Sequence, residues 1–198
     1  MRLGAIVSDI RCLVRRDGPG PTLRKVREGF EGHDLIVVAK RLDAIAEISL
    51  DRRLTLSDLT ESDLPALAEF NRRRCDTRAT ARFAAQLERG DRGFLVRNEG
   101  AVAGYYWWSD RDHPHLDRLG IRLEDRDVYG FDFFLAEEHR GDGRAVECLH
   151  GVETRLREFG FARVWGYVRG DNRPARWLYS SRGYDSVRKV HLRLGSMR

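Results

Sequence analysis

The spacing of apolar residues divides the chain into alternating helical and extended segments. Apolar residues that recur every three or four positions indicate amphipathic helices. Runs of branched and aromatic residues bounded by turn residues indicate strands. Helices are predicted over residues 3–15, 22–30, 64–74, 79–89, 143–159 and 172–182. Strands are predicted over residues 34–39, 54–56, 94–96, 102–108, 128–136 and 161–168, with one or two more between 186 and 194.

The order of these segments predicts a mixed α/β (α+β) fold. The turn at Asn98-Glu-Gly100 joins two strands and is typical of a β-hairpin. The segments 128–136, 143–159 and 161–168 form a strand-helix-strand unit, whose strands should be parallel and joined right-handedly. We therefore expect a central sheet that is antiparallel in its N-terminal part and enters a parallel unit near the C-terminus. Residues 109–127 are expected to be a long connection with at most a short strand.

Length and charge narrow the classes of protein that fit. A chain of 198 residues with 41% hydrophobic residues is large enough for one domain with a real core. The formal net charge of +5 favours anionic partners, which include nucleic acid and phosphorylated small molecules. We interpret the charge as dispersed, so nucleic-acid binding is disfavoured. No apolar run is long enough for a signal peptide or a membrane span, which predicts no membrane insertion.

The three cysteines, Cys12, Cys75 and Cys148, lie far apart in the sequence. Their odd number and spacing match neither a CxxC pair nor a disulfide framework. We therefore expect free thiols in a reducing compartment, and a cytoplasmic location fits this best.

Two histidines flank a proline in the 109–127 connection, at His113 and His115. A His-x-His pair can contribute to a metal site, but no third ligand lies at a convincing distance in the sequence. We expect surface histidines in a turn, and no bound metal.

A glycine loop between the strand 128–136 and the following helix is the main candidate for chemistry. Its sequence runs from Arg140 through Gly141, Asp142, Gly143 and Arg144 to Ala145. Glycines let the backbone approach a ligand, and the unpaired N–H groups at a helix start bind anions such as pyrophosphate. A tight turn would explain the glycines equally well. The spacing matches neither a P-loop nor a three-glycine dinucleotide motif.

The residue order around this loop resembles the GNAT superfamily of acyl-CoA-dependent N-acetyltransferases. The motif that carries the resemblance is Arg140-x-x-Gly143-x-Ala145, followed after the next strand by Asn172-x-x-Ala175-x-x-Leu178-Tyr179-x-x-x-Gly183-Tyr184. The resemblance covers about residues 54–194. It implies a GNAT acyltransferase domain at 51–198 and leaves residues 1–50 as an N-terminal arm. The arm would pack on the domain or form a homodimer contact.

The resemblance also implies roles for individual residues. The backbone of Phe134, Leu135 and Ala136 would pair with the pantetheine arm of acetyl-CoA, as if the cofactor were an added strand. The residues from Arg140 to Ala145 would hold the pyrophosphate. Asn172 would bond to the pantetheine region, although it could also simply cap its helix. The Tyr179 hydroxyl would lie near the sulfur and protonate the leaving thiolate; the alternative for Tyr179 is a core aromatic.

The general base is not identified by the motif. Tyr129, Asp132, Glu137 and Glu138 lie in the region where the family often places a glutamate, and none matches clearly. We select Asp132, because a carboxylate in an apolar strand should have a raised pKa. A structural acid with a partner is the alternative.

The sequence thus predicts an enzyme that moves acetyl from acetyl-CoA to a primary amine of a small molecule or peptide. The acceptor would lie near residues 70–78 and 109–127, where Arg72, Arg73 and Arg74 suggest an acidic group on it. Three alternatives stay open: an enzyme using a longer acyl group, a catalytically silent acyl-CoA sensor or scaffold, and a basic nucleic-acid binder.

Overall fold

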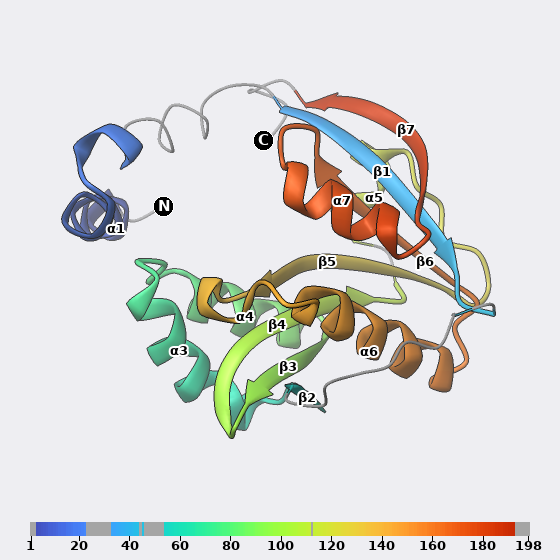
Figure 1. The fold of residues 1–198 in the computed structure, drawn as a ribbon, viewed down its shortest axis with the longest axis horizontal. Coiled ribbons are helices and arrows are strands. Elements are labelled where there is room, and N and C mark those ends of the chain that lie inside the picture. Colours follow the sequence, from blue (N-terminus) through green and yellow to red (C-terminus); the bar gives the residue numbers. More distant parts are fainter. Residues whose placement is uncertain (1–2, 23–32, 44, 46–53, 112, 193–198) are drawn as a thin grey trace. The chain divides into compact units, whose positions relative to one another are not determined.

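The computed structural model describes residues 3–22, 33–43, 45, 54–111 and 113–192 (Figure 1). The elements are α1 (Leu3–Asp17), β1 (His33–Arg41), β2 (Leu54–Asp58), η1 (Glu61–Asp63), α3 (Leu64–Arg73), α4 (Ala79–Glu88), β3 (Arg92–Asn98), β4 (Ala101–Ser109), α5 (Leu116–Leu119), β5 (Asp127–Leu135), η2 (Glu137–His139), α6 (Arg144–Glu158), β6 (Arg163–Arg169), α7 (Arg173–Ser181) and β7 (Asp185–Leu192). Most predicted segments are confirmed within a few residues. The predicted helix 22–30 lies almost wholly outside the described residues.

Contacts along the chain define two compact units. One is formed by Met1–His33, Thr60–Arg89 and His191–Arg198, and the other by Asp34–Leu59 and Gly90–Val190. The first unit holds α1, α3 and α4, whereas the second holds almost all of the sheet together with α5, α6 and α7. All the residues of the candidate site belong to the second unit.

The second unit is built on a seven-stranded sheet in the order β2-β3-β4-β5-β6-β1-β7. β3 and β4 form the predicted hairpin, and β5 pairs with β6 in parallel, so the predicted mixed sheet is confirmed. In the connection between β4 and β5 the structure has the short helix α5 rather than a strand. A single strand, β7, occupies the region where one or two were expected.

β1 is an inner strand of this sheet, and Figure 1 shows it beside β7. It pairs antiparallel with β6 from Leu35↔Arg169 to Arg41↔Arg163. Its side chains from Leu35 to Lys40 are all buried. Part of the segment expected to be an N-terminal arm is therefore a strand of the main sheet, and the proposed division at residue 50 stays a prediction.

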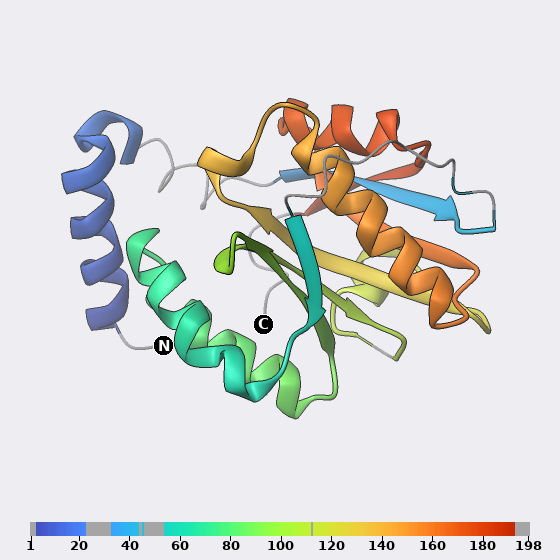
Figure 2. The ribbon, with the colours of Figure 1, turned by 60° about the horizontal axis from the view of Figure 1, so that its bottom comes forward.

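Helices α6 and α7 pack on the same face of the sheet. Leu149 and Val152 of α6 and Leu178 of α7 share one hydrophobic core with Val128 of β5 and Val164 of β6. Figure 2 shows α6 running along the strands. Because side chains alternate along a strand, the neighbouring residues of β5 and β6 point to the opposite face.

The first unit, which we call the helical unit because it holds α1, α3 and α4, contains a disulfide between Cys12 and Cys75. The sequence did not predict this disulfide. It joins α1 to the turn that follows α3 across 63 residues of sequence, and only Cys148 is a free cysteine. Next to it, Asp9 accepts a hydrogen bond from Thr77 Oγ1 at 2.6 Å. The expectation of three free thiols is wrong, because folding brings together two cysteines that are distant in the chain. None of the described helices is long and apolar enough to cross a membrane.

Candidate functional site

The parallel pairing of β5 and β6 is short, and the two strands part beyond it. The ladder joins Asp127, Val128 and Tyr129 to Arg163, Val164 and Trp165. β5 continues to Leu135 and β6 to Arg169 without further pairing between them. We call this parting of residues 130–135 from residues 166–169 the splay. In the splay the edges of the two strands face each other. An extended ligand could pair with these edges through main-chain hydrogen bonds.

A β-bulge lies in β5 at the splay. The register between β4 and β5 shifts between Tyr105 and Trp107, whose partners are Phe134 and Phe131. Within the bulge Asp132 has a φ of 48°, a left-handed conformation that few non-glycine residues adopt. Bulges re-aim side chains and are frequent at active sites. Asp132 is therefore half-buried at a local irregularity, rather than buried in a regular strand as expected.

The glycine loop forms a cradle of unpaired amides at the start of α6. Gly141, Asp142 and Gly143 all have positive φ, at 111°, 46° and 79°. The loop places five main-chain N–H groups without a hydrogen-bond acceptor in the described chain, those of Gly141, Asp142, Gly143, Ala145 and Val146. A Cβ built on Gly141 or Gly143 would meet nothing within 4 Å, so the space beside the loop is open. Such an arrangement at the positive end of a helix dipole suits an anion.

Two neighbours of the cradle are already engaged within the chain. The N–H of Ala136 donates to Ala103 O at 2.8 Å, and its carbonyl accepts from His139 N at 2.9 Å. Arg140 donates from Nε to Leu135 O at 2.7 Å, and its guanidinium lies over the Phe134 ring. The main-chain N–H of Ala136 is therefore not available to a ligand strand. The Arg140 side chain binds the end of β5 and does not extend toward the loop.

Helix α7 carries both residues of the second half of the motif. Asn172 is its N-cap, because Oδ1 accepts a hydrogen bond from Ala175 N at 3.1 Å. Tyr179 is partly buried against the core, and its ring meets that of Tyr184 edge-on at 4.8 Å. Burial, followed by the nearby Tyr167 and Glu153, raises the pKa of Tyr179 above its ordinary value. Tyr179 therefore keeps its proton at neutral pH and can act as a donor.

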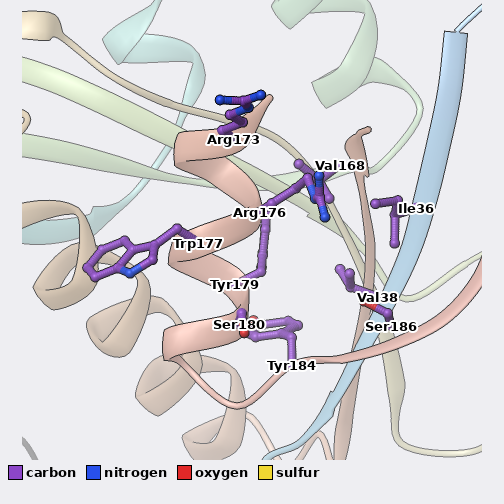
Figure 3. Close-up of a pocket in the computed structure, with 10 residues that line it drawn as sticks. All are labelled: Ile36, Val38, Val168, Arg173, Arg176, Trp177, Tyr179, Ser180, Tyr184 and Ser186. Carbon is purple, nitrogen blue, oxygen red and sulfur yellow. The ribbon is translucent and has the colours of Figure 1, made fainter. Parts of the chain in front are cut away.

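A pocket of about 420 Å³ adjoins Tyr179 between α7 and strands β1, β6 and β7 (Figure 3). Its floor is apolar, with Ile36 and Val38 of β1 beside Val168 of β6. The remaining lining residues are Arg173, Arg176, Trp177, Tyr179, Ser180, Tyr184 and Ser186. The sequence did not point to Ile36 or Val38 as site residues, because their place beside Tyr179 depends on the pairing of β1 with β6.

Asp132 and Tyr179 are linked through Tyr167 of β6. Burial, followed by the negative charge of Asp132, raises the pKa of Tyr167. Tyr167 in turn contributes to the raised pKa of Tyr179. The sequence did not predict Tyr167 as a site residue. The structure places it two residues beyond Trp165, the last residue of β6 that pairs with β5.

The other candidate bases fit less well. Glu137 and Glu138 lie in η2, after the end of β5, and both are exposed to solvent. Tyr129 is buried, and burial raises its pKa so strongly that it remains a neutral hydroxyl. Among the four candidates that the sequence offered, Asp132 is the carboxylate whose charge contributes to the raised pKa of Tyr167.

The comparison with known families agrees with this geometry. A family described as "Acetyltransferase (GNAT) family" matches residues 55–184, about two thirds of the chain. The chain belongs to the GNAT family. The splay, the glycine cradle and α7 all lie inside the matched region. β1, which lines the pocket beside Tyr179, lies before it.

Two curated GNAT relatives come from Bacillus subtilis (strain 168). The uncharacterized N-acetyltransferase YycN is 27% identical over 94 residues, which is 47% of this chain and 54% of YycN. The uncharacterized N-acetyltransferase YdgE is 29% identical over 91 residues, which is 46% of this chain and 52% of YdgE. This chain therefore spans about half the length of the curated relatives that it matches.

Solved structures share the fold at low sequence identity. A functionally unknown conserved protein from Staphylococcus epidermidis ATCC 12228 superposes with a TM-score of 0.61 and 15% identity, covering 88% of this chain and 66% of that one. A GCN5-related glucosamine N-acetyltransferase region of a fungal multi-domain GH3 beta-N-acetylglucosaminidase gives a TM-score of 0.62 and 16% identity, covering 89% and 23%. At these identities the likeness establishes the GNAT fold alone.

His113 is buried, which corrects the expectation of a surface histidine, whereas His115 is partly exposed in a turn. His113 is only 7% exposed and packs on the Phe131 ring at 4.4 Å. His115 is partly exposed, and its Nδ1 lies 3.2 Å from Tyr129 Oη. Within the described residues, no group of three or more His, Cys, Asp or Glu side chains could hold a metal ion.

The arginines expected near an acidic acceptor already have partners in the helical unit. Arg72 and Arg73 both contact Glu69, at 2.8 Å and 3.0 Å. Arg74 donates to Asn71 Oδ1 at 2.8 Å. Glu69 thus pairs with two of these arginines, and the acidic group on the acceptor stays a prediction.

Proposed function

We propose that this GNAT-family protein transfers acetyl from acetyl-CoA to a primary amine by direct attack of the amine on the thioester. The observation that carries the proposal is the cradle of unpaired amides at the start of α6, together with Tyr179 on α7 at the splay. The family match covers all these elements.

The residues present fit the phosphates of CoA. Five N–H groups that lack acceptors point to an anion of more than one oxygen, and Gly141 and Gly143 leave room beside the loop. Arg144, at the first position of α6, would add a charge-assisted contact. The main chain of Phe134 and Leu135 at the splay would pair with the extended pantetheine arm.

Tyr179 would supply the proton that the leaving thiolate needs. The raised pKa keeps Tyr179 protonated at neutral pH, so the hydroxyl holds a proton for the thiolate. Asn172, whose Oδ1 caps α7, keeps its amide NH₂ for the ligand. A main-chain N–H near the bulge of β5 would stabilise the negative charge that develops on the carbonyl oxygen.

Asp132 would take up the proton that an ammonium acceptor must lose before it attacks. Asp132 lies in the bulge of β5 at the splay, and its charge contributes to the raised pKa of Tyr167. The same negative charge would attract the ammonium form of the acceptor, so that Asp132 contributes to both binding and deprotonation.

The test combines calorimetry with acetyl-CoA and a panel of primary amines assayed for release of the CoA thiol. We expect acetyl-CoA to bind and at least one amine to be acetylated. Tyr179→Phe should lower kcat by about 100-fold while leaving the Kd for acetyl-CoA within about twofold. Normal binding with no release of thiol for any amine would instead identify a silent acyl-CoA sensor. Absence of acetyl-CoA binding contradicts the proposal altogether.

A longer acyl group is the second candidate, because of the pocket beside Tyr179. Its apolar floor of Ile36, Val38 and Val168 offers more room than an acetyl group fills. Competition between acetyl-CoA and butyryl-CoA, with mass spectrometry of the acylated amine, separates the two. A preference for butyryl-CoA that Val38→Phe abolishes would support the longer group. Equal use of acetyl-CoA by the wild type and by Val38→Phe would exclude it.

A further inference from the structure

The pocket between α7 and strands β1, β6 and β7 combines an apolar floor with polar groups that have no partner. Ile36, Val38 and Val168 form the floor and belong to the hydrophobic core that α6 and α7 share. The volume of about 420 Å³ leaves room for an aliphatic chain as well as a polar group. All the described lining residues lie in the second unit, so the pocket belongs to one compact part of the chain.

Two arginines of α7 line this pocket without an acidic partner. Arg176 donates from Nη1 to the carbonyl of Gly170 at 3.1 Å, and within the described chain neither Arg173 nor Arg176 forms an ion pair with a carboxylate. Figure 3 shows Arg176 directed toward the strands, whereas Trp177 is directed away from them. None of the described lining residues is acidic. The positive charge of both guanidinium groups is therefore available to an anion.

Tyr184 adds a buried hydroxyl that has no partner. The residue is 7% exposed and lines the pocket, and its Oη makes no hydrogen bond within the described chain. Burial raises the pKa of Tyr184, so the hydroxyl keeps its proton. Buried polar groups are nearly always paired, and an unpaired one beside a pocket indicates a ligand atom that would pair with it. The hydroxyl-bearing side chains of Ser180 and Ser186 also line the pocket.

These groups together favour one class of ligand. A guanidinium can bind a planar carboxylate through two parallel N–H groups. A small hydrated anion such as inorganic phosphate would leave the apolar floor exposed to water, whereas an aliphatic chain would cover it. The acyl chain of a thioester would use the floor alone and leave both guanidinium groups without a counter-charge. A carboxylate attached to an aliphatic chain satisfies the floor and the arginines at once.

We propose that this pocket binds a small organic acid, with its carboxylate on Arg176 and Arg173 and its aliphatic chain on the floor of Ile36, Val38 and Val168. Two kinds of molecule present this chemistry, a free aliphatic acid and an aliphatic amino acid. The binding itself does not depend on the proposed acetyl transfer.

An amino acid in the pocket would have a further role, which does rest on the proposed function. Tyr179 also lines the pocket, so the amine of a bound amino acid would lie near the residue that we assign to the leaving thiolate. The amine nitrogen would form its bond to the acetyl carbon as the bond to sulfur breaks. The ammonium gives one proton to solvent before attack and a second to Tyr179, which has protonated the thiolate. The acceptor would then be an aliphatic amino acid.

Calorimetry of the full chain without CoA compares three probes that share one branched chain. The probe 4-methylpentanoate carries only the carboxylate, 3-methylbutylamine only the amine, and leucine both. We expect 4-methylpentanoate and leucine to bind and 3-methylbutylamine not to bind. Arg176→Gln should raise the Kd for 4-methylpentanoate by about tenfold. Arg157→Gln, at an exposed position of α6 outside the pocket, is the matched control and should leave this Kd within about twofold.

A second variant tests the floor independently of the charge. Val38→Phe should also raise the Kd for 4-methylpentanoate, because the larger ring occupies the place of the aliphatic chain, and thermal unfolding shows that each variant is folded. The proposed site would be overturned if 3-methylbutylamine bound as tightly as 4-methylpentanoate, if Arg176→Gln left the Kd unchanged, or if neither acid bound to the wild type.

Acetyl-CoA then separates the two kinds of ligand. Release of the CoA thiol with leucine, with a KM that Arg176→Gln raises, would identify an amino acid as the acceptor. Binding of both acids without thiol release from leucine would identify a free acid as the ligand of the site. Failure of the wild type to bind acetyl-CoA would count against the proposed function and leave the acid site standing, since its Kd values are measured without CoA.

Discussion

Lys40 and Glu153 form a buried ion pair that joins β1 to α6, with Nζ 2.7 Å from Oε2. The side chains are 8% and 0% exposed. Arg182, at the end of α7, contacts the same carboxylate oxygen and also His150 Nδ1. Burial lowers the pKa of Lys40, and Glu153 partly opposes this. One carboxylate thus connects the strand that precedes the family-matched region to both helices of the candidate site.

Replacing Glu153 should lower the free energy of unfolding more than replacing either of its partners. Glu153→Gln leaves Lys40 and Arg182 buried without a counter-charge, so we expect a loss of about 3–5 kcal/mol in the free energy of unfolding. Lys40→Met should cost less, about 1–2 kcal/mol, because Arg182 still pairs with Glu153. Urea unfolding measures both values.

Arg41→Met is the matched control on the same strand. Arg41 pairs with Asp43, but its side chain is 79% exposed, and exposed ion pairs contribute little. A change of unfolding free energy for Glu153→Gln as small as that for Arg41→Met would show that the buried pair does not hold β1 in place.

Asp127 should make the protein sensitive to acid. Burial alone would raise its pKa, but hydrogen bonds from Arg163, the Glu124 main chain and Trp165 outweigh burial and lower it. A lowered pKa in the folded state contributes stability above the ordinary value of 3.8, and this stability is lost as the pH falls through the folded value. We expect Asp127→Asn to lower the free energy of unfolding at neutral pH by about 1–3 kcal/mol. The free energy of unfolding of this variant should also depend less on pH in the acid range.

The measurement is urea unfolding at a series of pH values from neutral into the acid range. Asp125→Asn, at an exposed position in the turn before β5, is the control and should follow the wild-type curve. An Asp127→Asn curve parallel to that of the wild type at acid pH would contradict the role assigned to this carboxyl.

Gly143 and Gly160 stand at opposite ends of α6 and allow a matched test of the cradle. Both have positive φ, at 79° and 91°, and a Cβ on either would meet nothing within 4 Å. Changing each to alanine should therefore cost a similar amount of stability, about 1 kcal/mol, from backbone strain. Only Gly143→Ala would place a methyl group where we propose that the phosphates bind.

We expect Gly143→Ala to raise the Kd for CoA by about tenfold and Gly160→Ala to leave it unchanged, as measured by calorimetry. Comparable Kd values for the two variants would remove the glycine loop from the binding site, whatever their stability.

The disulfide between Cys12 and Cys75 predicts a specific thiol count. The unfolded but unreduced protein should show one reactive thiol, that of Cys148, and the reduced protein three. In the chain-entropy model, closing a loop of 63 residues stabilises the fold by about 4 kcal/mol, so Cys12→Ser should lower the unfolding free energy by an amount of this order. Three thiols before reduction would show that the pair is not bonded.

Local patterns in the sequence were sufficient for most of the fold. The apolar stripe of Leu149, Val152 and Leu156 predicts the helix that α6 forms, because these residues lie on one face at helical spacing. The turn at Asn98-Glu-Gly100 predicts the β3–β4 hairpin for an equally local reason. The glycine loop and the start of α6 were found in the same way.

Several parts of the candidate site could not be derived from such patterns. The strand pattern of residues 34–39 indicates β1 but not its neighbours, since pairing with β6 depends on hydrogen bonds to a segment far along the chain. The burial of His113 against Phe131 and the contact of His115 with Tyr167 depend on rings contributed by β5 and β6. The left-handed bulge at Asp132 arises from the register between β4 and β5.

The sequence by itself determined the local elements, the glycine loop before α6, and the motif with Asn172 and Tyr179. Each depends on residues within a few turns or strand lengths of one another. Only the tertiary structure decided that β1 lies between β6 and β7, that Cys12 meets Cys75, and that β5 and β6 part beyond Tyr129 and Trp165. The physical reason is that these relationships join distant segments, whose approach is set by burial and strand pairing across the whole chain and not by any local pattern.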